Sequence, residues 1–278
     1  MPTKIEWCEE TKNPVKVKGP DGKPQGYHCT KISEGCVHCY GEPINRRFGN
    51  RIPYDDRDIK FVLDRKVFEQ IGTWRKKPRR CFVQSMSDLF HKQIPDGLIG
   101  EVLSTLNIFK RHTFIFLTKR PERMKEMTAK AFPDGPPAHF WLGVTAENQA
   151  RADERIPVLL SIPAAVHFVS IEPCLGPVDL SRWISPVGTG APFTSIMTGD
   201  KITFSHALKW VILGCETGPG RRTMQPVWAR DVKDQCVAAG VPFFLKQMYR
   251  NDGTLWKLPQ LDGQIWNQYP NNERTPNA

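Results

Sequence analysis

The chain has 278 residues, of which 40% are hydrophobic and 10% aromatic, so it can build one large core or two small ones. Its 39 Lys and Arg residues against 29 Asp and Glu residues give a formal charge of +10. That charge suits nucleic acid as a partner and equally suits an ordinary basic surface. No apolar run approaches the ~18–20 residues that cross a membrane, and the first residues lack the apolar stretch of a signal peptide. We therefore expect a cytoplasmic protein with no membrane partner.

Three cysteines close together are the first chemical signal along the chain. Cys29, Cys36 and Cys39 have the spacing C-x6-C-x2-C, and no fourth cysteine lies nearby. Eight cysteines in a chain of this length do not form a disulfide framework. Three thiolates can hold a metal or an iron–sulfur cluster and leave one coordination position open for chemistry. Zinc completed by His28 or His38 is the alternative, although a residue beside a ligand usually points away from the metal.

From residue 80 onward, short apolar runs alternate with amphipathic patterns. The expected strands are 80–85, 113–118, 140–145, 166–171, 210–214 and 242–246. The expected helices cover 95–109, a segment that begins at Pro121, 150–160 and 227–239. Brief hydrophobic runs are typical of strands buried on both faces of a parallel sheet. Their alternation with helices predicts right-handed βαβ units and an α/β fold.

Polar residues follow nearly every expected strand. They are Ser85, Ser87 and Asp88; Thr118, Lys119 and Arg120; Thr145, Glu147 and Asn148; Glu172; Glu216; and Lys246 and Gln247. A single polar strand end is an ordinary turn or helix cap. Parallel α/β folds place their functional sites at the carboxyl ends of the strands, so six such ends in series predict convergence on one cavity.

Two stretches interrupt the pattern, and the end of the chain lacks it. Residues 16–25 are rich in Gly, Pro and Lys and predict a hairpin or loop, and 181–205 predict an insertion. The tail from residue 251 has no periodicity, and we expect its end to be disordered. These patterns predict one domain over 1–250, with the cysteine loop at 27–42 and a partly disordered extension over 251–278.

Several segments resemble known radical S-adenosylmethionine (SAM) enzymes. Residues 35–40 (GCVHCY) resemble the G-C-x-x-C-Y segment of these enzymes, particularly of the spore photoproduct lyase-like branch. Residues 85–90, 116–120 and 143–145 resemble the segments that follow or form its next strands. The first cysteine gap is longer than the usual C-x3-C, and Ser-Met-Ser-Asp stands where the superfamily has a glycine-rich motif.

The chain as a whole is more similar to the phage Gp37/Gp68 family of radical-SAM-like proteins, whose function is poorly defined. The similarity covers roughly residues 3–250. It is carried by the segments 5–7, 11–14, 31–33, 170–176, 214–219 and 243–247.

The resemblance implies a partial (β/α)6 TIM-like barrel of the radical SAM type. It also implies that Cys29, Cys36 and Cys39 bind a 4Fe–4S cluster whose open iron binds SAM, which is cleaved to a 5′-deoxyadenosyl radical. The residues implied to bind the cofactors are Tyr40, Ser85, Ser87, Asp88, Thr145 and Glu147. Those implied to contact SAM or substrate in catalysis are Asp88, Lys119, Glu172 and Glu216.

Three functions remain open on the sequence alone. The first is a radical SAM enzyme that modifies or repairs nucleic acid. The second is a radical SAM enzyme that acts on a protein or small molecule, for which the resemblance suggests a co-encoded three-Cys-motif partner protein. Both would need an electron donor such as flavodoxin or ferredoxin. The third is a non-catalytic zinc-binding module for nucleic acid.

Overall fold

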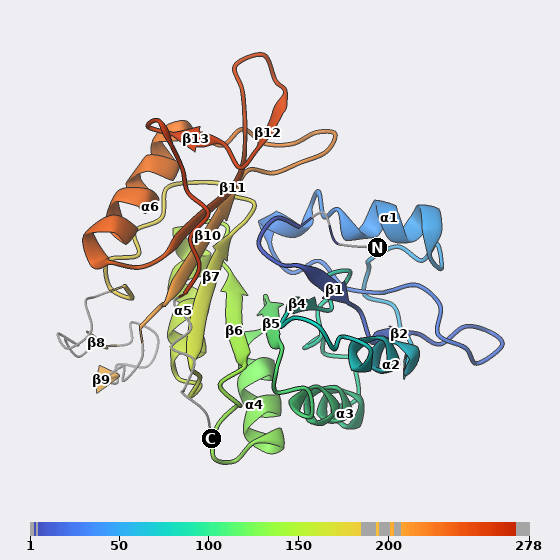
Figure 1. Cartoon of the computed structure of the whole chain (residues 1–278). Coiled ribbons are helices and arrows are strands. Elements are labelled where there is room, and N and C mark those ends of the chain that lie inside the picture. The colour runs from blue at the N-terminus through green and yellow to red at the C-terminus, as the bar shows by residue number, and fades with distance from the viewer. Residues whose placement is uncertain (1–2, 4, 185–192, 195–200, 203–206, 271–278) are drawn as a thin grey trace.

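A computed structural model describes residues 3, 5–184, 193–194, 201–202 and 207–270. Its centre is an open, strongly curled sheet of eight strands in the order β1-β4-β5-β6-β7-β10-β11-β12, with helices outside (Figure 1). The pairs from β1 to β11 are parallel, and β12 runs antiparallel to β11. The expected α/β fold is confirmed, in the form of a half-barrel.

The sheet strands agree closely with the apolar runs of the sequence. They are β1 (Glu10–Lys12), β4 (Arg80–Val83), β5 (Thr113–Thr118), β6 (Phe140–Thr145), β7 (Val166–Ile171), β10 (Trp210–Gly214), β11 (Phe243–Tyr249) and β12 (Leu255–Lys257). β1 and β12 were not expected. Each has three residues, too few to show a period, and each forms by pairing with a longer neighbour.

Four helices cover the outside of the sheet and match the expected segments: α3 (Asp96–Asn107), α4 (Pro121–Ala131), α5 (Gln149–Leu160) and α6 (Pro226–Ala239). Near the cysteines lie the 3-10 turn η1 (Glu34–Cys36) and the helices α1 (Gly41–Phe48) and α2 (Lys66–Gly72). Small pairs of strands are β2 (Val15–Val17) with β3 (Phe61–Leu63), β8 (Phe193–Thr194) with β9 (Lys201–Ile202), and β13 (Gln260–Leu261) with β14 (Gln264–Ile265). No helix among the described residues is long and apolar enough to cross a membrane.

The expected loop at 16–25 is a hairpin in which Lys18 bridges to Pro24. Most of the expected insertion at 181–205 lies outside the described residues, as do the last eight residues, 271–278. The described part of the tail packs on the half-barrel. There the backbone oxygen of Gln268 accepts a 2.9 Å hydrogen bond from the indole of Trp210.

Large aromatic side chains fill one end of the half-barrel interior. Trp7, Trp141, Phe168 and Trp210 form a buried cluster, and the ring of Trp210 lies 5.6–6.1 Å from the other three. Trp141 and Trp210 lie at the beginnings of β6 and β10, and Trp7 precedes β1. Towards the strand ends the inward positions become small and polar, as in the series Trp141, Gly143 and Thr145 of β6. The half-barrel is therefore plugged at one end and hollow at the other.

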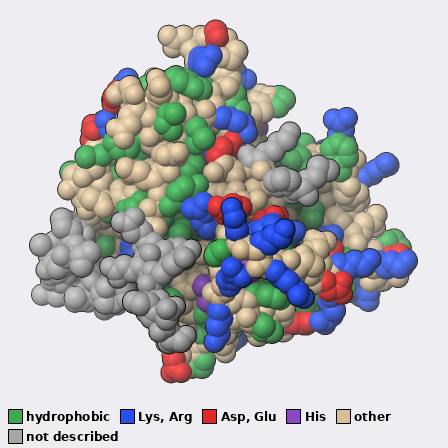
Figure 2. Space-filling view, in the orientation of Figure 1, with side chains coloured by type: hydrophobic (Ala, Val, Ile, Leu, Met, Phe, Trp, Pro, Cys, Tyr) green, Lys and Arg blue, Asp and Glu red, His purple; other side chains and the backbone are tan. Residues whose placement is uncertain are grey.

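Short runs rich in Lys and Arg lie at both ends of the sheet. Residues 75–80 and 110–112 precede β4 and β5, whereas 119–120 and 221–222 follow β5 and β10. Figure 2 shows Lys and Arg side chains over the middle of the face that it presents and on the projecting β11–β12 hairpin. The charge of +10 is therefore not concentrated around the hollow end.

Candidate functional site: a cysteine-lined pocket

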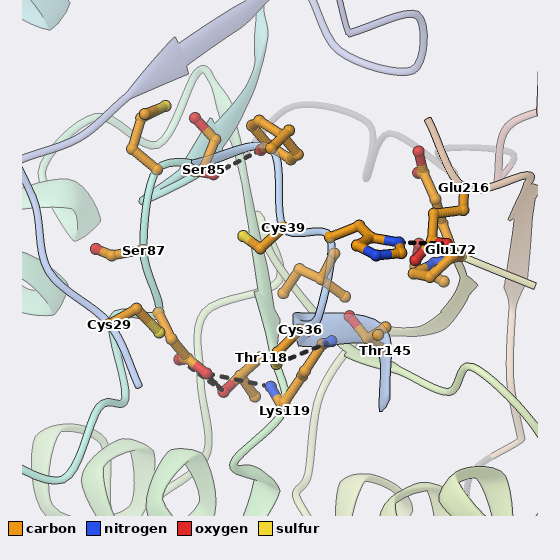
Figure 3. A pocket seen from close by; sticks show the side chains of 18 of the residues that line it. Cys29, Cys36, Cys39, Ser85, Ser87, Thr118, Lys119, Thr145, Glu172 and Glu216 are labelled. Atoms are coloured by element: carbon orange, nitrogen blue, oxygen red, sulfur yellow. Dashed lines mark hydrogen bonds and ion pairs between the residues drawn. The ribbon is translucent and has the colours of Figure 1, made fainter. Parts of the chain in front are cut away.

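A pocket occupies the hollow end of the half-barrel, where the parallel strands end. Its volume is about 210 Å³. Predicted site residues in its wall are Cys29, Cys36, Cys39, Tyr40, Ser85, Ser87, Asp88, Thr118, Lys119, Thr145, Glu172 and Glu216. Figure 3 shows the three cysteines between Ser85 and Ser87 on one side and Glu172 and Glu216 on the other. The polar strand ends therefore converge as the sequence predicted, with Glu147 just behind the wall.

A tight turn positions the cysteine segment over the strand ends. The N–H of Cys36 donates to the Ser33 carbonyl at 2.9 Å, and the N–H of Cys39 donates to the Cys36 carbonyl at 3.4 Å. Gly35 lies between Ser33 and Cys36 and is buried, and a Cβ there would come within 2.5 Å of the Glu147 side chain. All three cysteines are free thiols with intermediate exposure.

Cys36 lies beside a lysine. The ammonium of Lys119 is 3.5 Å from the sulfur, and the hydroxyl of Ser33 is 3.7 Å from it. Burial alone would raise the pKa of the Cys36 thiol, but Lys119, the backbone N–H groups and Ser33 together outweigh it and lower that pKa. Cys36 is therefore the thiol of the three that ionises most easily.

Cys29 lies beside an arginine that holds several groups together. Burial raises the pKa of the Cys29 thiol to about 12, although the Arg120 guanidinium, 3.9 Å from the sulfur, opposes the shift. Arg120 also donates to the Asp88 carboxylate at 2.8 Å and to the Thr30 hydroxyl at 2.9 Å. The Thr30 hydroxyl in turn lies 3.0 Å from the ring nitrogen of His91. Arg120 thus connects the cysteine segment to the ends of β4 and β5.

Asp88 is held from all sides. Its carboxylate accepts hydrogen bonds from the Thr118 hydroxyl at 2.8 and 2.9 Å, from the Lys119 N–H at 3.2 Å and from the Phe90 N–H at 2.9 Å, besides the one from Arg120. Only 6% of the residue is exposed. Its donors leave its oxygens little capacity for a further ligand, so the geometry favours a positioning role for Asp88.

Cys39 is followed by a tyrosine that bridges to the opposite wall. The hydroxyl of Tyr40 donates to the Ser85 carbonyl at 2.6 Å. Burial raises the pKa of the Cys39 thiol, and the N–H groups of Gly41 and Glu42 oppose the shift. The Ser87 hydroxyl accepts from the Gln84 amide at 2.7 Å, while the Ser85 hydroxyl has only a long contact of 3.4 Å, to Asn13. Ser85 therefore keeps more hydrogen-bonding capacity toward the pocket.

A fully buried carboxylate supports the cysteine turn from below. Glu147 accepts from Lys119 at 2.6 Å, from Ser33 at 2.5 Å and from Arg155 at 2.9 Å. Burial would raise the pKa of Glu147, but Lys119 and Arg155 outweigh it and lower that pKa. Arg155, itself 1% exposed, also donates to the Thr145 carbonyl at 2.8 Å. Breaking such a network would leave uncompensated buried charge, which costs about 3–5 kcal/mol.

Two acidic residues line the other side of the pocket. Glu216 lies 3.0 Å from the His38 ring nitrogen and accepts from the N–H and guanidinium of Arg222. Burial would raise the pKa of Glu216, but Arg222 and His38 lower it to about 2. Glu172 accepts from the ammonium of Lys246 at 2.5 Å. Each acid of this wall therefore faces a cation.

Residues 2–270 match a family model described as a protein of unknown function, DUF5131. The chain belongs to the DUF5131 family. The match covers nearly the whole chain and agrees with the resemblance to phage Gp37/Gp68-like proteins. No curated protein and no solved structure matches this DUF5131 chain significantly.

Neither the zinc hypothesis nor the cluster hypothesis finds a preformed metal site in the described part of this DUF5131 protein. There, no three His, Cys, Asp or Glu side chains lie close enough together to hold a single metal ion. His28 is fully buried and stacks edge-on against Tyr54 and His91 rather than lining the pocket. His38 lines the pocket, but its ring nitrogen faces Glu216.

Sequence reasoning missed four polar residues that organise this DUF5131 pocket: Ser33, Arg120 as an individual contact, Arg155 and Arg222. Arg120 was expected only as one of the polar residues after the strand at 113–118, not as a partner of Cys29 and Thr30, and Arg222 was not expected at the site. Arg155 lies on α5, where an amphipathic pattern gives no sign that one guanidinium turns inward. The available signal was position, because Arg120 directly follows a strand whose other end residues face the pocket.

Proposed function

We propose that this protein is a radical SAM-like enzyme in which Cys29, Cys36 and Cys39 hold a 4Fe–4S cluster, and that its substrate is nucleic acid. The observation that carries the proposal is the convergence of three free thiols and six polar strand ends on one pocket of a half-barrel. Three cysteine sulfurs are the donor set for three irons of such a cluster, which leaves one iron for a ligand.

The surroundings of the thiols fit a cluster of thiolate ligands. Thiolates need positive charge nearby when they are removed from water. Lys119 supplies it at Cys36, and Arg120 supplies it at Cys29. Arg120 and Lys119 are themselves fixed by Asp88 and Glu147. This support fits a site that keeps its shape while thiols lose their protons.

A reduced cluster held by Cys29, Cys36 and Cys39 would supply the one electron that splits SAM into methionine and a 5′-deoxyadenosyl radical. The chain's own residues bind, orient and shield. Ser85, Ser87 and Thr145 present small polar groups at the strand ends, suited to hydrogen bonds with a polar cofactor. Lys246 and Glu172 form a charged pair on the far wall, suited to a charged ligand group. The aromatic plug beneath the pocket excludes water from the strand starts.

Anaerobic reconstitution tests the proposal. The protein, incubated with iron, sulfide and reductant, should turn brown with absorbance near ~400 nm and should form 5′-deoxyadenosine from SAM. Cys36→Ala should abolish SAM cleavage. Cys236→Ala is the matched control, because Cys236 is buried on α6 away from the pocket and should leave cleavage intact. Tight zinc binding without iron uptake, or full cleavage by Cys36→Ala, would overturn the proposal.

Nucleic acid is proposed as the substrate because of the charge of +10 and the resemblance to the photoproduct lyase-like branch. An electron donor such as flavodoxin or ferredoxin belongs to the same proposal. A protein or small-molecule substrate, with a co-encoded partner, is the competing outcome. Salt-dependent binding separates the two, because phosphate contacts release counterions and weaken steeply as salt rises.

A further inference from the structure

The pocket rim carries two arginines stacked on aromatic rings. Arg221 lies over the ring of Tyr249, 4.0 Å from its centre, and Arg250 lies over Trp256 at 4.9 Å. Both arginines are exposed, and both rings are half-buried. Stacking fixes the plane of a guanidinium while leaving most of its N–H donors free to point outward.

These side chains belong to two rim segments, 217–222 and 249–257. Thr217 lines the pocket, and Gly220 lies against His38, where an added Cβ would come within 3.4 Å of the ring. Arg222 reaches across to the Glu34 carbonyl at 2.9 Å. Arg221 donates to the Gly253 carbonyl at the hairpin tip at 3.3 Å. The stacked arginines are therefore built onto the wall of the cysteine pocket.

The charge of the rim is unbalanced. The two segments contain four Lys or Arg residues and one acid, Asp252. Arg222 is paired with Glu216, and Lys257 with Glu6. Within the described residues, no carboxylate lies within ion-pair distance of Arg221 or Arg250. Such arginines suit an anion from outside the chain, and a planar guanidinium matches phosphate oxygens.

A second basic surface lies at the opposite end of the sheet. Arg111 donates to the carbonyls of Arg75 and Lys76 and so joins the loops before β4 and β5. Lys77 and Lys110 are exposed beside them. This surface contains more Lys and Arg residues than the rim, but it is separated from the cysteines by the length of the strands and by the aromatic plug. A nucleic acid bound there could not place a reacting base in the pocket.

We infer that the rim segments bind the phosphate backbone of single-stranded nucleic acid through Arg221 and Arg250 and direct one nucleotide into the cysteine pocket. This inference rests on the proposed function. The strand is single because the reacting groups lie inside a hollow, which a base reaches only when it is out of a duplex stack.

Fluorescence anisotropy with a labelled single-stranded DNA of about 20 nucleotides, and with its duplex, tests the inference. For a single strand, each phosphate contact contributes about 0.7 to the steepness with which the logarithm of the binding constant falls with the logarithm of salt concentration. Because the double variant R221A/R250A loses two such contacts, it should bind the single strand about 10–30-fold more weakly near 0.1 M salt. The matched control K76A/K77A removes the same charge from the opposite surface and should bind within about twofold of wild type. All four residues are exposed, so both variants should fold.

Three results would overturn the inference. In the first, R221A/R250A binds the single strand as tightly as wild type while K76A/K77A binds it more weakly. In the second, the duplex binds more tightly than the single strand. In the third, neither probe binds at low salt. SAM cleavage without nucleic acid, measured on the same R221A/R250A protein, should equal that of wild type. If the protein binds nucleic acid through the rim but does not cleave SAM, only the proposed chemistry is wrong. If it cleaves SAM but does not bind nucleic acid through the rim, only the rim inference is wrong.

Discussion

The two ends of the half-barrel interior are built from the same strands by opposite means. Near the strand starts, Trp7, Trp141 and Trp210 pack ring against ring with almost no exposure. At the strand ends, the carboxylates and the thiols of Cys29 and Cys36 are held beside cations. The apolar end gains stability from burial, whereas the polar end gains fixed geometry at a desolvation cost. The residues that stabilise the fold and the residues of the candidate site therefore lie at opposite ends of the same strands.

The largest expected effect lies at the apolar end. Trp210→Ala should lower the free energy of unfolding by about 3–5 kcal/mol, because it removes a fully buried ring and leaves a cavity. Denaturant titration measures this change. Val237→Ala, at an exposed position of α6, should stay within about 0.5 kcal/mol of wild type. A Trp210→Ala protein as stable as that control would contradict the conclusion that the apolar end of the half-barrel stabilises the fold.

A smaller, pH-dependent effect is expected at the polar end. Glu216 has its pKa lowered to about 2, so its stabilising effect is present above its ordinary pKa and is lost as pH falls through the folded value. Glu216→Gln should therefore cost about 2 kcal/mol near pH 7, and the difference from wild type should shrink between about pH 5 and pH 2. Urea titrations over that range measure it, with the exposed Glu122→Gln as control. A difference that grows on acidification would contradict the assignment.

The smallest effect concerns the reactivity of the thiols. In protein without metal, iodoacetamide should modify Cys36 before Cys29, because the pKa of Cys36 is lowered and that of Cys29 is raised to about 12. Lys119→Met should slow modification of Cys36 by roughly 3–10-fold and leave Cys29 unchanged. Site-resolved mass spectrometry measures both rates. Equal rates at the two sites would show that Lys119 does not control Cys36.

Much of the fold could be predicted because its long strands are buried on both faces. The runs at 113–118, 140–145, 166–171 and 210–214 became β5, β6, β7 and β10 with those bounds. β1 escaped prediction because Glu10–Lys12 is polar and three residues long. α1 escaped it because its sequence, GEPINRRF, is polar with an exposed Phe48. Both depend on neighbours that a local pattern does not reveal.

The sequence could predict which residues lie at the site, but not which side chains they contact there. Residues after strands were expected to converge, and Ser85, Lys119 and Glu172 do line one pocket. Which side chains pair with one another depends on contacts between segments that are far apart in the sequence. The pair Arg222 and Glu216 is local, but Arg120 meets Thr30 across ninety residues. Whether the cysteines hold a cluster, and whether Tyr40, Thr145 or Glu147 serve a cofactor, stay predictions.

The contact between Gly35 and Glu147 has an evolutionary consequence. A Cβ at position 35 would come within 2.5 Å of the buried Glu147 side chain, so residue 35 cannot gain a side chain while Glu147 is present without displacing the turn that carries Cys36. Relatives that keep an acid at position 147 should keep glycine at 35, and those with a larger residue at 35 should have a shorter one at 147. The two positions form a paired sequence marker that separates chains with this turn from chains that merely share the cysteine spacing.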